Sequence, residues 1–419
     1  MRTYTEALEV LRSRVRPLGK VEVPLDQALG RVAAEAVRAP SDQPPWANAA
    51  MDGYAVRSAD VAVPEERPAL RVIGQVAAGQ WPDRTVEPGT AVRIFTGAPV
   101  PPGADAVVPQ EDVVETPEGI QIRRPVSPGE NVRPPAEDFS AGTCLIPVGR
   151  YITPADIALA ATVGRDRLWV YRVPRALVLA SGQELAEPGQ PLERGRIYDS
   201  NSYFLQARLR RLGIPVERWS FLPDRWADVR STLARAFDRF DVVITTGGVS
   251  VGEYDLIRKA WESLGLETLI AGVAIKPGKP LWVGTADGRW AFGLPGNPAS
   301  AYVCLEAFVY PWLWWVQGFP GALPYRFPVT LGRAVQNPGG RTFFLRCRLH
   351  VRPEGWYAEP AGPQGSHIVR TTARSQALVV VEPNARLEAG AVVGALIPEA
   401  HPLDLLLAEN SEWRVANGE

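Results

Sequence analysis

The sequence predicts a multidomain fold built from α/β and β parts. We expect a central α/β domain with a mostly parallel sheet, an inserted β-rich domain, a linking mixed domain and a small C-terminal β-barrel-like domain. Three observations lead to this prediction. The 419 residues suffice for several domains. Short Val/Ile-rich runs broken by turns fill residues 40–139. Strand and helix patterns alternate from about residue 172.

The N-terminal residues predict an amphipathic helix, because Tyr4, Leu8, Leu11 and Val15 recur on one side. We assign residues 1–20, together with 172–320, to the α/β domain. Residues 21–39 and 140–171 have a mixed, partly helical pattern. We expect these two pieces to join each other as the linking domain on either side of the insertion.

The inserted domain, residues 40–139, has no long helical periodicity. Its strand-like runs include Leu70–Val76 and Ala91–Phe95. Two glycine turns carry polar side chains, Asp52 in Met-Asp-Gly-Tyr-Ala and Thr96 in Phe-Thr-Gly-Ala, and Asp138 belongs to an acidic pair. Taken singly, such turns are more often structural than functional.

In the α/β domain the sequence pattern predicts strands near residues 176–180, 216–221, 241–245, 268–275, 281–284 and 290–293, with helices near 202–212, 226–237 and 256–264. This alternation favours a mostly parallel sheet covered on both faces. The apolar run 299–316 is interrupted by Glu306 and Pro311, so we expect a buried or interface helix and no membrane span. Residues 321–419 predict the C-terminal β domain.

Composition excludes several classes of protein. The 45 basic and 46 acidic residues give a net charge of -1, which argues against a nucleic-acid binder with a broad basic face. Three separated cysteines and three histidines imply neither a disulfide framework nor a zinc site. The N-terminus lacks a signal-peptide apolar core. We therefore expect a cytoplasmic protein.

Only four of the 45 basic residues are lysines, and two of these, Lys276 and Lys279, share the segment Ile-Lys-Pro-Gly-Lys-Pro. Lysine is a compact point charge that approaches one oxygen of an anion, whereas arginine is a planar fork. The flanking proline and glycine residues stiffen and tighten the loop. The pair therefore indicates a small anionic ligand.

The run Thr245–Glu253 follows a buried strand and precedes a helix. Its glycines allow backbone N–H groups to crowd an anion at a helix N-terminus, and Thr246 and Ser250 add hydroxyl groups. The carboxylates of Glu253 and Asp255 suit an anion bridged by a cation. The alternative is an ordinary tight turn. The run is neither a Walker A loop nor a GxGxxG motif.

Other loops follow neighbouring strands. Leu294–Pro298 contains Asn297 and Pro298, which equally well explain simple helix initiation, and Asp199–Asn201 fits a helix cap. Because ligands bind at the carboxyl ends of parallel strands, loops 181–184, 246–253, 276–280 and 294–298 should gather at one edge of the sheet. We expect glycine backbone, two ammonium groups and carboxylates in one pocket for phosphate and an oxyanion.

Five ordered motifs resemble one family. They are Met51–Ala55, Phe95–Val108, Thr246–Gly252, Ile275–Pro280 and Leu294–Pro298. The chain resembles the MoeA family of molybdopterin molybdenumtransferases, which is related to the E domain of gephyrin. The resemblance implies a four-domain homodimer and a reaction with Mg²⁺ as cofactor. Adenylylated molybdopterin is hydrolysed, AMP leaves and molybdate is inserted; molybdopterin adenylyltransferase is the implied upstream partner.

The resemblance also implies residue roles. The implied substrate-binding residues are Gly247, Gly248, Ser250, Gly252, Lys276, Lys279, Pro295, Asn297 and Pro298. The implied catalytic and metal-binding carboxylates of the α/β domain are Glu184, Asp224 and Asp255. The implied catalytic residues of the β-rich domain, contributed by the partner subunit, are Asp52, Thr96 and Asp138.

Two positions depart from the family pattern. Gln183 stands where the family usually has an aspartate, and an amide is a weaker metal ligand than a carboxylate. His367 stands where the family often has a second glycine, in a C-terminal turn that we expect to lie far from the chemistry. The alternative functions are a non-catalytic molybdopterin carrier and a scaffold of the gephyrin E-domain type.

Overall fold

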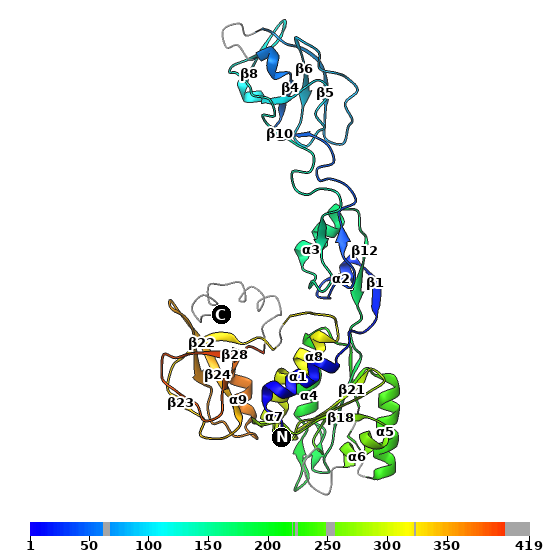
Figure 1. The fold of residues 1–419 in the computed structure, drawn as a ribbon, viewed down its shortest axis with the longest axis vertical. Coiled ribbons are helices and arrows are strands. Elements are labelled where there is room, and N and C mark those ends of the chain that lie inside the picture. Colours follow the sequence, from blue (N-terminus) through cyan, green and yellow to red (C-terminus); the bar gives the residue numbers. More distant parts are fainter. Residues whose placement is uncertain (62–67, 220, 223–224, 249–255, 322–323, 399–419) are drawn as a thin grey trace. The chain divides into compact units, whose positions relative to one another are not determined.

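The computed structural model describes residues 1–61, 68–219, 221–222, 225–248, 256–321 and 324–398. They fall into two compact units, both drawn in Figure 1. The first unit contains Met1–Ala34, Val148–Thr153 and the chain from Arg167 onward. The second unit contains Glu35–Pro147 and Pro154–Asp166. The chain therefore leaves the first unit early and returns to it after a long insertion.

A six-stranded sheet forms the centre of the first unit, in the order β16-β13-β17-β21-β20-β18. The first four strands run parallel, whereas β20 is antiparallel to β21 and β18 is antiparallel to β20. The predicted mostly parallel sheet is confirmed. The strands are β13 Ala176–Ala180, β16 Val216–Arg218, β17 Val242–Thr246, β18 Glu267–Ala271, β20 Trp282–Ala286 and β21 Arg289–Leu294.

Both faces of this sheet are covered, because successive side chains of a strand point to opposite faces. Val178 and Ile244 belong to one hydrophobic core, which includes side chains of α1, α4, α7, η3 and α8. Leu179 and Val243 belong to another, with side chains of α5 and α6. Figure 1 shows α5 and α6 together at one side of the sheet. The helices are α1 Tyr4–Arg14, α4 Asn201–Arg211, α5 Trp226–Arg239, α6 Leu256–Ser263, α7 Pro298–Cys304, the π-helix η3 Leu305–Val309 and α8 Tyr310–Trp315.

The amphipathic helix predicted at the N-terminus is α1. A capping box begins it: the backbone N–H of Glu6 donates to the Thr3 hydroxyl, and the backbone N–H of Thr3 donates to the Glu6 carboxylate. Tyr4 and Leu11 are buried in the larger core. The N-terminal residues therefore complete the α/β layer packing.

The apolar run 299–316 is a buried helical segment, as predicted. All of its side chains from α7 to α8 are buried. The carboxylate of Glu306 pairs with the Arg208 guanidinium at 2.8 Å, and both side chains are almost fully buried. Among the described residues, no helix has the length and apolar character needed to cross a membrane.

The C-terminal part of the first unit is a small closed barrel, which confirms the predicted type. Strand β24 pairs with both β25 and β26, and this closes the ring β24-β25-β22-β28-β26. Leu345 and Val379 belong to the barrel's hydrophobic core. The strands are β22 Phe327–Leu331, β24 Thr342–Arg352, β25 Gly355–Pro360, β26 Ala377–Val381 and β28 Val392–Leu396, with a short pair β23 Val335–Gln336 and β27 Arg386–Leu387 and the helix α9 Val369–Arg374.

The strand expected to run to Ile275 is divided in two. Strand β18 ends at Ala271, and Gly272 turns the chain with a φ of 86°. A two-residue strand, β19 (Ile275–Lys276), then pairs in parallel with the start of β24 in the barrel. The segment containing both lysines therefore joins the α/β sheet to the barrel.

The second unit is built on a four-stranded sheet in the order β5-β6-β4-β7, with a hairpin of β8 and β9. The register places Val76, Ile94 and Gly53 side by side at one end of the sheet. Its elements are β2 Val37–Arg38, β3 Asn48–Ala49, β4 Gly53–Val56, η1 Ser58–Val61, β5 Arg71–Val76, β6 Thr90–Ile94, β7 Ala106–Pro109, η2 Gln110–Asp112, β8 Val113–Thr116, β9 Gly119–Ile122, β10 Val132–Arg133, β11 Cys144–Ile146 and α3 Pro154–Thr162.

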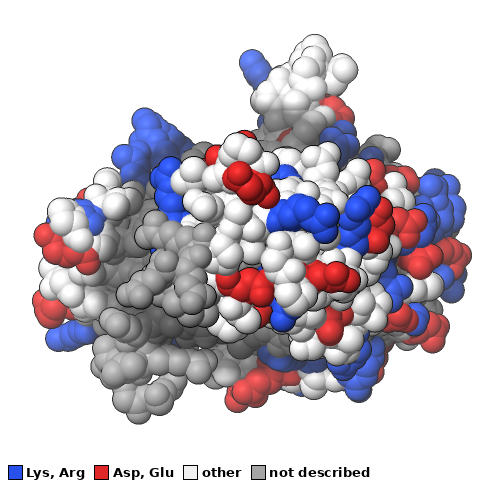
Figure 2. Space-filling view, turned by 90° about the horizontal axis from the view of Figure 1, so that it is seen from above, with Lys and Arg blue, Asp and Glu red and all other residues white. Residues whose placement is uncertain are grey.

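The chain segments on either side of the insertion pair with each other. Strand β1 (Lys20–Pro24) is antiparallel to β12 (Arg167–Tyr171), and Val32 bridges to Tyr151. The short helix α2 (Leu25–Ala28) follows β1 directly. On the face drawn in Figure 2, acidic and basic side chains of the described residues are interspersed.

Candidate functional site

A cavity of about 720 Å³ lies where parallel strands of the α/β sheet end. Loops that follow β13, β17 and β21 contribute to its lining, as the strand order predicts. The lining residues are Ser181, Gly182, Glu184, Leu185, Ile197, Tyr198, Asp199, Ser200, Asn201, Thr246, Gly247, Gly248, Pro280, Pro295, Gly296, Asn297, Pro298, His367 and Val369. The loops after β13, β17 and β21 therefore meet at one edge, whereas loop 276–280 contributes only Pro280 to the described lining.

Gly247 allows two of these loops to approach each other closely. Its φ is 83°, and a Cβ atom there would lie 2.2 Å from the Ser181 carbonyl oxygen. The Ser181 N–H donates to the Thr246 carbonyl at 2.9 Å, and the Gly247 N–H donates to the Leu294 carbonyl at 3.1 Å. The glycine turn is thus fixed between the ends of the strands on both sides of β17.

Asn201 links the start of α4 to two loops of the cavity. Its side-chain amide donates to the Thr246 hydroxyl at 2.9 Å and to the Gly296 carbonyl at 2.7 Å. Asn201 is the first residue of α4, so the helix holds the ends of β17 and β21 in a fixed relation. The sequence interpretation of Asn201 as part of a helix cap missed this role.

The side-chain cap of α4 comes from Asp199, and not from Ser200 or Asn201. The buried Asp199 carboxylate accepts a 3.0 Å hydrogen bond from the Ser202 backbone N–H and a second one from the Ser202 hydroxyl. Ser200 occupies the N-cap position without a side-chain capping bond. A carboxylate at a helix N-terminus also interacts favourably with the helix dipole.

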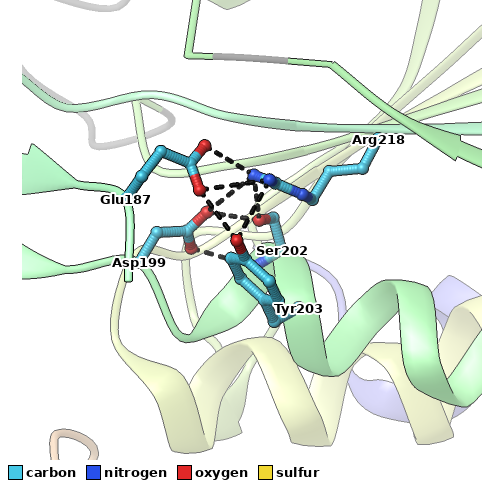
Figure 3. Close-up of polar contacts among 5 residues, drawn as sticks. All are labelled: Glu187, Asp199, Ser202, Tyr203 and Arg218. Carbon is cyan, nitrogen blue, oxygen red and sulfur yellow. Dashed lines mark hydrogen bonds and ion pairs between the residues drawn. The ribbon is translucent and has the colours of Figure 1, made fainter. Parts of the chain in front are cut away.

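A polar network supports this wall of the cavity (Figure 3). The Arg218 guanidinium donates to both Glu187 oxygens at 2.8 and 3.1 Å and to the Tyr203 hydroxyl at 3.2 Å. Tyr203 donates to Glu187 at 2.9 Å, and Asp199 lies 3.9 Å from Arg218. The network thus connects the loop after β13, the start of α4 and strand β16.

Charge pairing within the network shifts its protonation equilibria. The hydrogen bonds from Arg218 lower the pKa of Glu187. The hydrogen bond to Glu187 raises the pKa of Tyr203, and the pairing with Glu187 raises the pKa of Arg218. At neutral pH the network therefore contains a carboxylate, a neutral phenol and a guanidinium. It positions the loop that contributes Ile197 and Tyr198 to the cavity.

Glu184 is the candidate carboxylate that lines the cavity. It is exposed, and its side chain folds over Gly182: a Cβ atom at Gly182 would lie 2.6 Å from a Glu184 oxygen. Its neighbour Gln183 is exposed as well. The described residues contain no cluster of three His, Cys, Asp or Glu side chains that could hold a metal ion. Asp224 and Asp255 lie outside the described residues, as do Ser250 and Gly252.

Lys276 and Lys279 are both exposed, on a loop whose centre is buried. The lining of the cavity by described residues includes their neighbour Pro280 but neither lysine. The Lys276 ammonium lies 5.0 Å from the ring centroid of Phe343 in the barrel. A Cβ atom at Gly278 would lie 2.8 Å from the Cys304 sulfur, so a glycine at this position allows the loop to pack closely against α7.

The segment Leu294–Pro298 contributes Pro295, Asn297 and Pro298 to the lining. Asn297 occupies the N-cap position of α7, and Pro298 is the first helical residue. The Asn297 side chain makes no capping hydrogen bond and is exposed in the cavity. The arrangement therefore leaves this amide available to a ligand.

His367 lines the cavity, so the expectation that it lies far from the site is wrong. The loop that carries it comes from the barrel domain and is held by Arg346, which is fully buried. The Arg346 guanidinium donates to the carbonyls of Gly365 and Ile368 at 3.0 and 3.2 Å. Burial lowers the pKa of Arg346. Local sequence patterns carry no signal for this long-range arrangement.

The remaining candidates belong to the second unit. The Asp52 carboxylate accepts hydrogen bonds from the backbone N–H and the hydroxyl of Thr96, at 2.8 and 2.7 Å. These bonds lower the pKa of Asp52. The backbone N–H of Asp138 donates to the Gln43 carbonyl at 2.9 Å. The structure thus brings Asp52 and Thr96 together.

Three family models match the chain. The MoeA N-terminal region (domain I and II) matches residues 2–164, the probable molybdopterin binding domain matches residues 177–314, and the MoeA C-terminal region (domain IV) matches residues 328–397. Together they extend over most of the sequence.

Named relatives match over most of their length. Molybdopterin molybdenumtransferase 2 of Mycobacterium tuberculosis is 38% identical over 389 residues, covering 90% of this chain and 95% of that protein. Molybdopterin molybdenumtransferase of Haemophilus influenzae is 35% identical over 366 residues, covering 85% and 88%. A crystal structure of the molybdopterin biosynthesis moea protein from Pyrococcus horikosii has a TM-score of 0.83 at 33% identity, covering 95% of this chain and 99% of that one.

Proposed function

On the basis that the chain belongs to the MoeA family of molybdopterin molybdenumtransferases, enzymes of molybdenum cofactor biosynthesis, we propose that its α/β cavity binds adenylylated molybdopterin. There the adenylate is hydrolysed, AMP leaves and molybdenum from molybdate enters the dithiolene. The cavity at the ends of β13, β17 and β21 carries this proposal. It joins a glycine turn, amide and hydroxyl groups and a carboxylate in about 720 Å³.

The residues of the cavity suit phosphate binding by their position at strand ends and helix starts and by their polar groups. The Gly247 N–H is already hydrogen-bonded to Leu294, so we propose that a phosphate group meets the backbone at Gly248, which also lines the cavity. The Asn297 amide is available to a ligand at the start of α7. Cleavage of a phosphoanhydride depends mainly on positioning and electrostatic stabilisation, so the cavity requires no nucleophilic side chain.

Glu184 fits a magnesium site of the kind that uses few protein ligands. Mg²⁺ is commonly held by one or two carboxylates together with substrate phosphates. Glu184 offers hard oxygens at the cavity, and we propose it as a ligand together with Asp224 and Asp255. When bound, Mg²⁺ neutralises charge on the phosphate oxygens. The amide of Gln183 is a weaker neighbour for the metal than the family's aspartate.

Lys276 and Lys279 are the proposed ligands of molybdate. Both ammonium groups are on an exposed part of the loop, whereas Pro277 and Gly278 between them are buried. A rigid loop centre with exposed point charges is suited to a tetrahedral oxyanion, because each charge approaches one oxygen. We propose that Ser250, Gly252 and Pro295 complete the binding of the two substrates.

We also propose a homodimer in which Asp52, Thr96 and Asp138 of one subunit serve the cavity of its partner. Mixing two inactive variants tests this: Asp52→Asn and Glu184→Gln subunits, dissociated and reassociated together, should recover activity. If equal amounts of the subunits combine at random, about half of the dimers are mixed and each has one intact site, so we expect about a quarter of all sites to be intact. If mixed dimers of verified composition recover no activity, the shared site is contradicted.

Molybdopterin adenylyltransferase is the proposed source of the substrate, in the cytoplasm. The three cysteines are free thiols, which suits a reducing compartment. A coupled reaction with that enzyme should produce molybdenum cofactor from molybdopterin, ATP, molybdate and Mg²⁺.

Purified protein, adenylylated molybdopterin, molybdate and Mg²⁺ provide the direct test. We expect AMP release that depends on molybdate, together with a product that activates a molybdenum enzyme lacking its cofactor. Tight binding of the substrate without molybdate-dependent AMP release would instead identify a carrier. Glu184→Gln should reduce turnover, with Glu193→Gln, an exposed glutamate outside the cavity lining, as the control.

A further inference from the structure

Two exposed tryptophans form an aromatic corner on the second unit. The rings of Trp46 and Trp81 are perpendicular, with centroids 5.3 Å apart. Trp46 is 43% exposed and Trp81 is 68% exposed, the largest exposed fraction of any described tryptophan. Perpendicular rings leave two apolar faces at a right angle. A third planar ring can stack on one of them while its edge meets the other.

The sheet register places the start of the segment that leads to Trp81 at the same sheet edge as Asp52 and Thr96. Val76, Ile94 and Gly53 end or begin three adjacent strands at one edge. The turn before Trp81 follows Val76, Thr96 follows Ile94, and Asp52 precedes Gly53. Residues far apart in the sequence thus share one cluster of loops.

Backbone contacts tighten this cluster. The Gly97 N–H donates to the Ala49 carbonyl at 2.8 Å, and the Val100 N–H donates to the Ala47 carbonyl at 2.9 Å, next to Trp46. A Cβ atom at Gly97 would lie 4.0 Å from Ala78, in the turn that leads to Trp81. A Cβ atom at Gly79 would meet nothing within 4 Å. The turn that leads to Trp81 therefore faces open space at Gly79.

We propose that Trp46 and Trp81 bind a planar nitrogen heterocycle of the substrate, the pterin or the adenine of adenylylated molybdopterin. The inference rests on the proposed function and adds a ring-binding subsite to it. A corner of two indoles matches one ring system. It is too small for a stable protein interface, which buries roughly 800 Å² per partner. Asp52 and Thr96 supply polar groups beside the ring.

The variants Trp46→Ala and Trp81→Ala of the full-length chain test the subsite. Each variant should raise the KM for adenylylated molybdopterin about 5- to 150-fold, the effect that stacking of about 1–3 kcal/mol per base produces, with kcat nearly unchanged. Trp81→Phe should retain most of the affinity. Trp226→Ala is the matched control, because Trp226 is 42% exposed and belongs to the other unit.

Binding of AMP alone and of 6-hydroxymethylpterin alone identifies the ring. Loss of AMP binding in both alanine variants assigns the corner to adenine, and loss of pterin binding assigns it to the pterin. If the wild-type protein turns over while both alanine variants keep their KM and their affinities for both probes, the inference is overturned and the proposed function stands. If the wild-type protein releases no AMP but binds a probe that both alanine variants fail to bind, the proposed function fails and the ring site remains.

Discussion

The side-chain amide of Asn201 donates a 2.9 Å hydrogen bond to the hydroxyl of Thr246, and the same nitrogen donates to the Gly296 carbonyl. A single residue at the start of α4 thus sets the spacing between two loops of the cavity. The loop positions follow from hydrogen bonds as much as from the strands that precede them.

Asn201→Ala should lower the free energy of unfolding by about 1–2 kcal/mol, because two hydrogen bonds of about 1 kcal/mol each are lost. It should also weaken binding of adenylylated molybdopterin, since both loops lose their link. Urea unfolding and equilibrium binding measure the two effects. Ser200→Ala is the stability control, because Ser200 makes no side-chain capping bond. Equal destabilisation by both variants would contradict the role of Asn201.

Gly247→Ala should be more destabilising than Gly213→Ala. Both glycines have positive φ values, 83° and 72°, so both alanines carry backbone strain of roughly 1–2 kcal/mol. Only at Gly247 would the Cβ atom also meet a carbonyl oxygen, at 2.2 Å; at Gly213 it would meet nothing within 4 Å. We expect an additional loss of about 1–3 kcal/mol in urea unfolding. Similar losses would show that the loops separate easily.

Glu187→Gln should reduce the pH dependence of stability on the acid side. Arg218 lowers the pKa of Glu187 in the folded state, so the carboxylate stabilises the fold above its unfolded pKa of about 4.3. This contribution is lost as the pH falls through the lower, folded pKa. The pair is partly exposed, so we expect about 1 kcal/mol at pH 7. Urea unfolding between pH 7 and 3 measures it, with Glu193→Gln as control; a constant difference between wild type and Glu187→Gln would refute the linkage.

Lys279→Arg should lose at least about tenfold in molybdate-dependent turnover while the melting temperature stays the same. A guanidinium is larger and planar, and does not replace one ammonium against one oxyanion oxygen. Lys259→Arg is the matched control, because Lys259 is exposed on α6. AMP release at saturating adenylylated molybdopterin and varied molybdate measures the effect. Wild-type turnover by the Lys279 variant would remove the point-charge argument.

Arg346→Met should displace the loop that carries His367. The buried guanidinium donates to Gln364, Gly365, Ile368 and Thr372. In the methionine variant the oxygen acceptors of these residues would lose the guanidinium as donor, which lowers the free energy of unfolding by about 1–3 kcal/mol per unsatisfied group. Arg346→Lys should rescue little, because an ammonium cannot reach the same fork of acceptors. Proteolysis within 361–372, compared with thermal unfolding, separates loop release from global unfolding; an unchanged cleavage pattern would contradict the positioning role.

Local sequence patterns predicted the layers of the α/β domain well. Residues such as Val178 and Leu179 alternate between two cores, and this follows from the two-residue period of a strand. The convergence of the loops at Ser181, Thr246 and Pro295 follows from strand direction. These features depend on the segments themselves and on general rules of parallel sheets.

The features that sequence patterns could not predict depend on distant partners. Strand β19 is defined by its pairing with β24, about seventy residues later, so the pattern near Ile275 did not show where the first strand ends. His367 reaches the cavity through the folding of the barrel and the bonds of Arg346. Asp199, rather than Ser200, caps α4 because its carboxylate is buried against Ser202.

The pairing of Ile275–Lys276 with Thr342–Phe343 makes the position of the lysine loop depend on the barrel. A chain shortened to end before the barrel would deprive the lysine loop of its neighbouring strand and the cavity of His367. Such a fragment would also expose the larger hydrophobic core, because Phe344 and Val380 of the barrel belong to it.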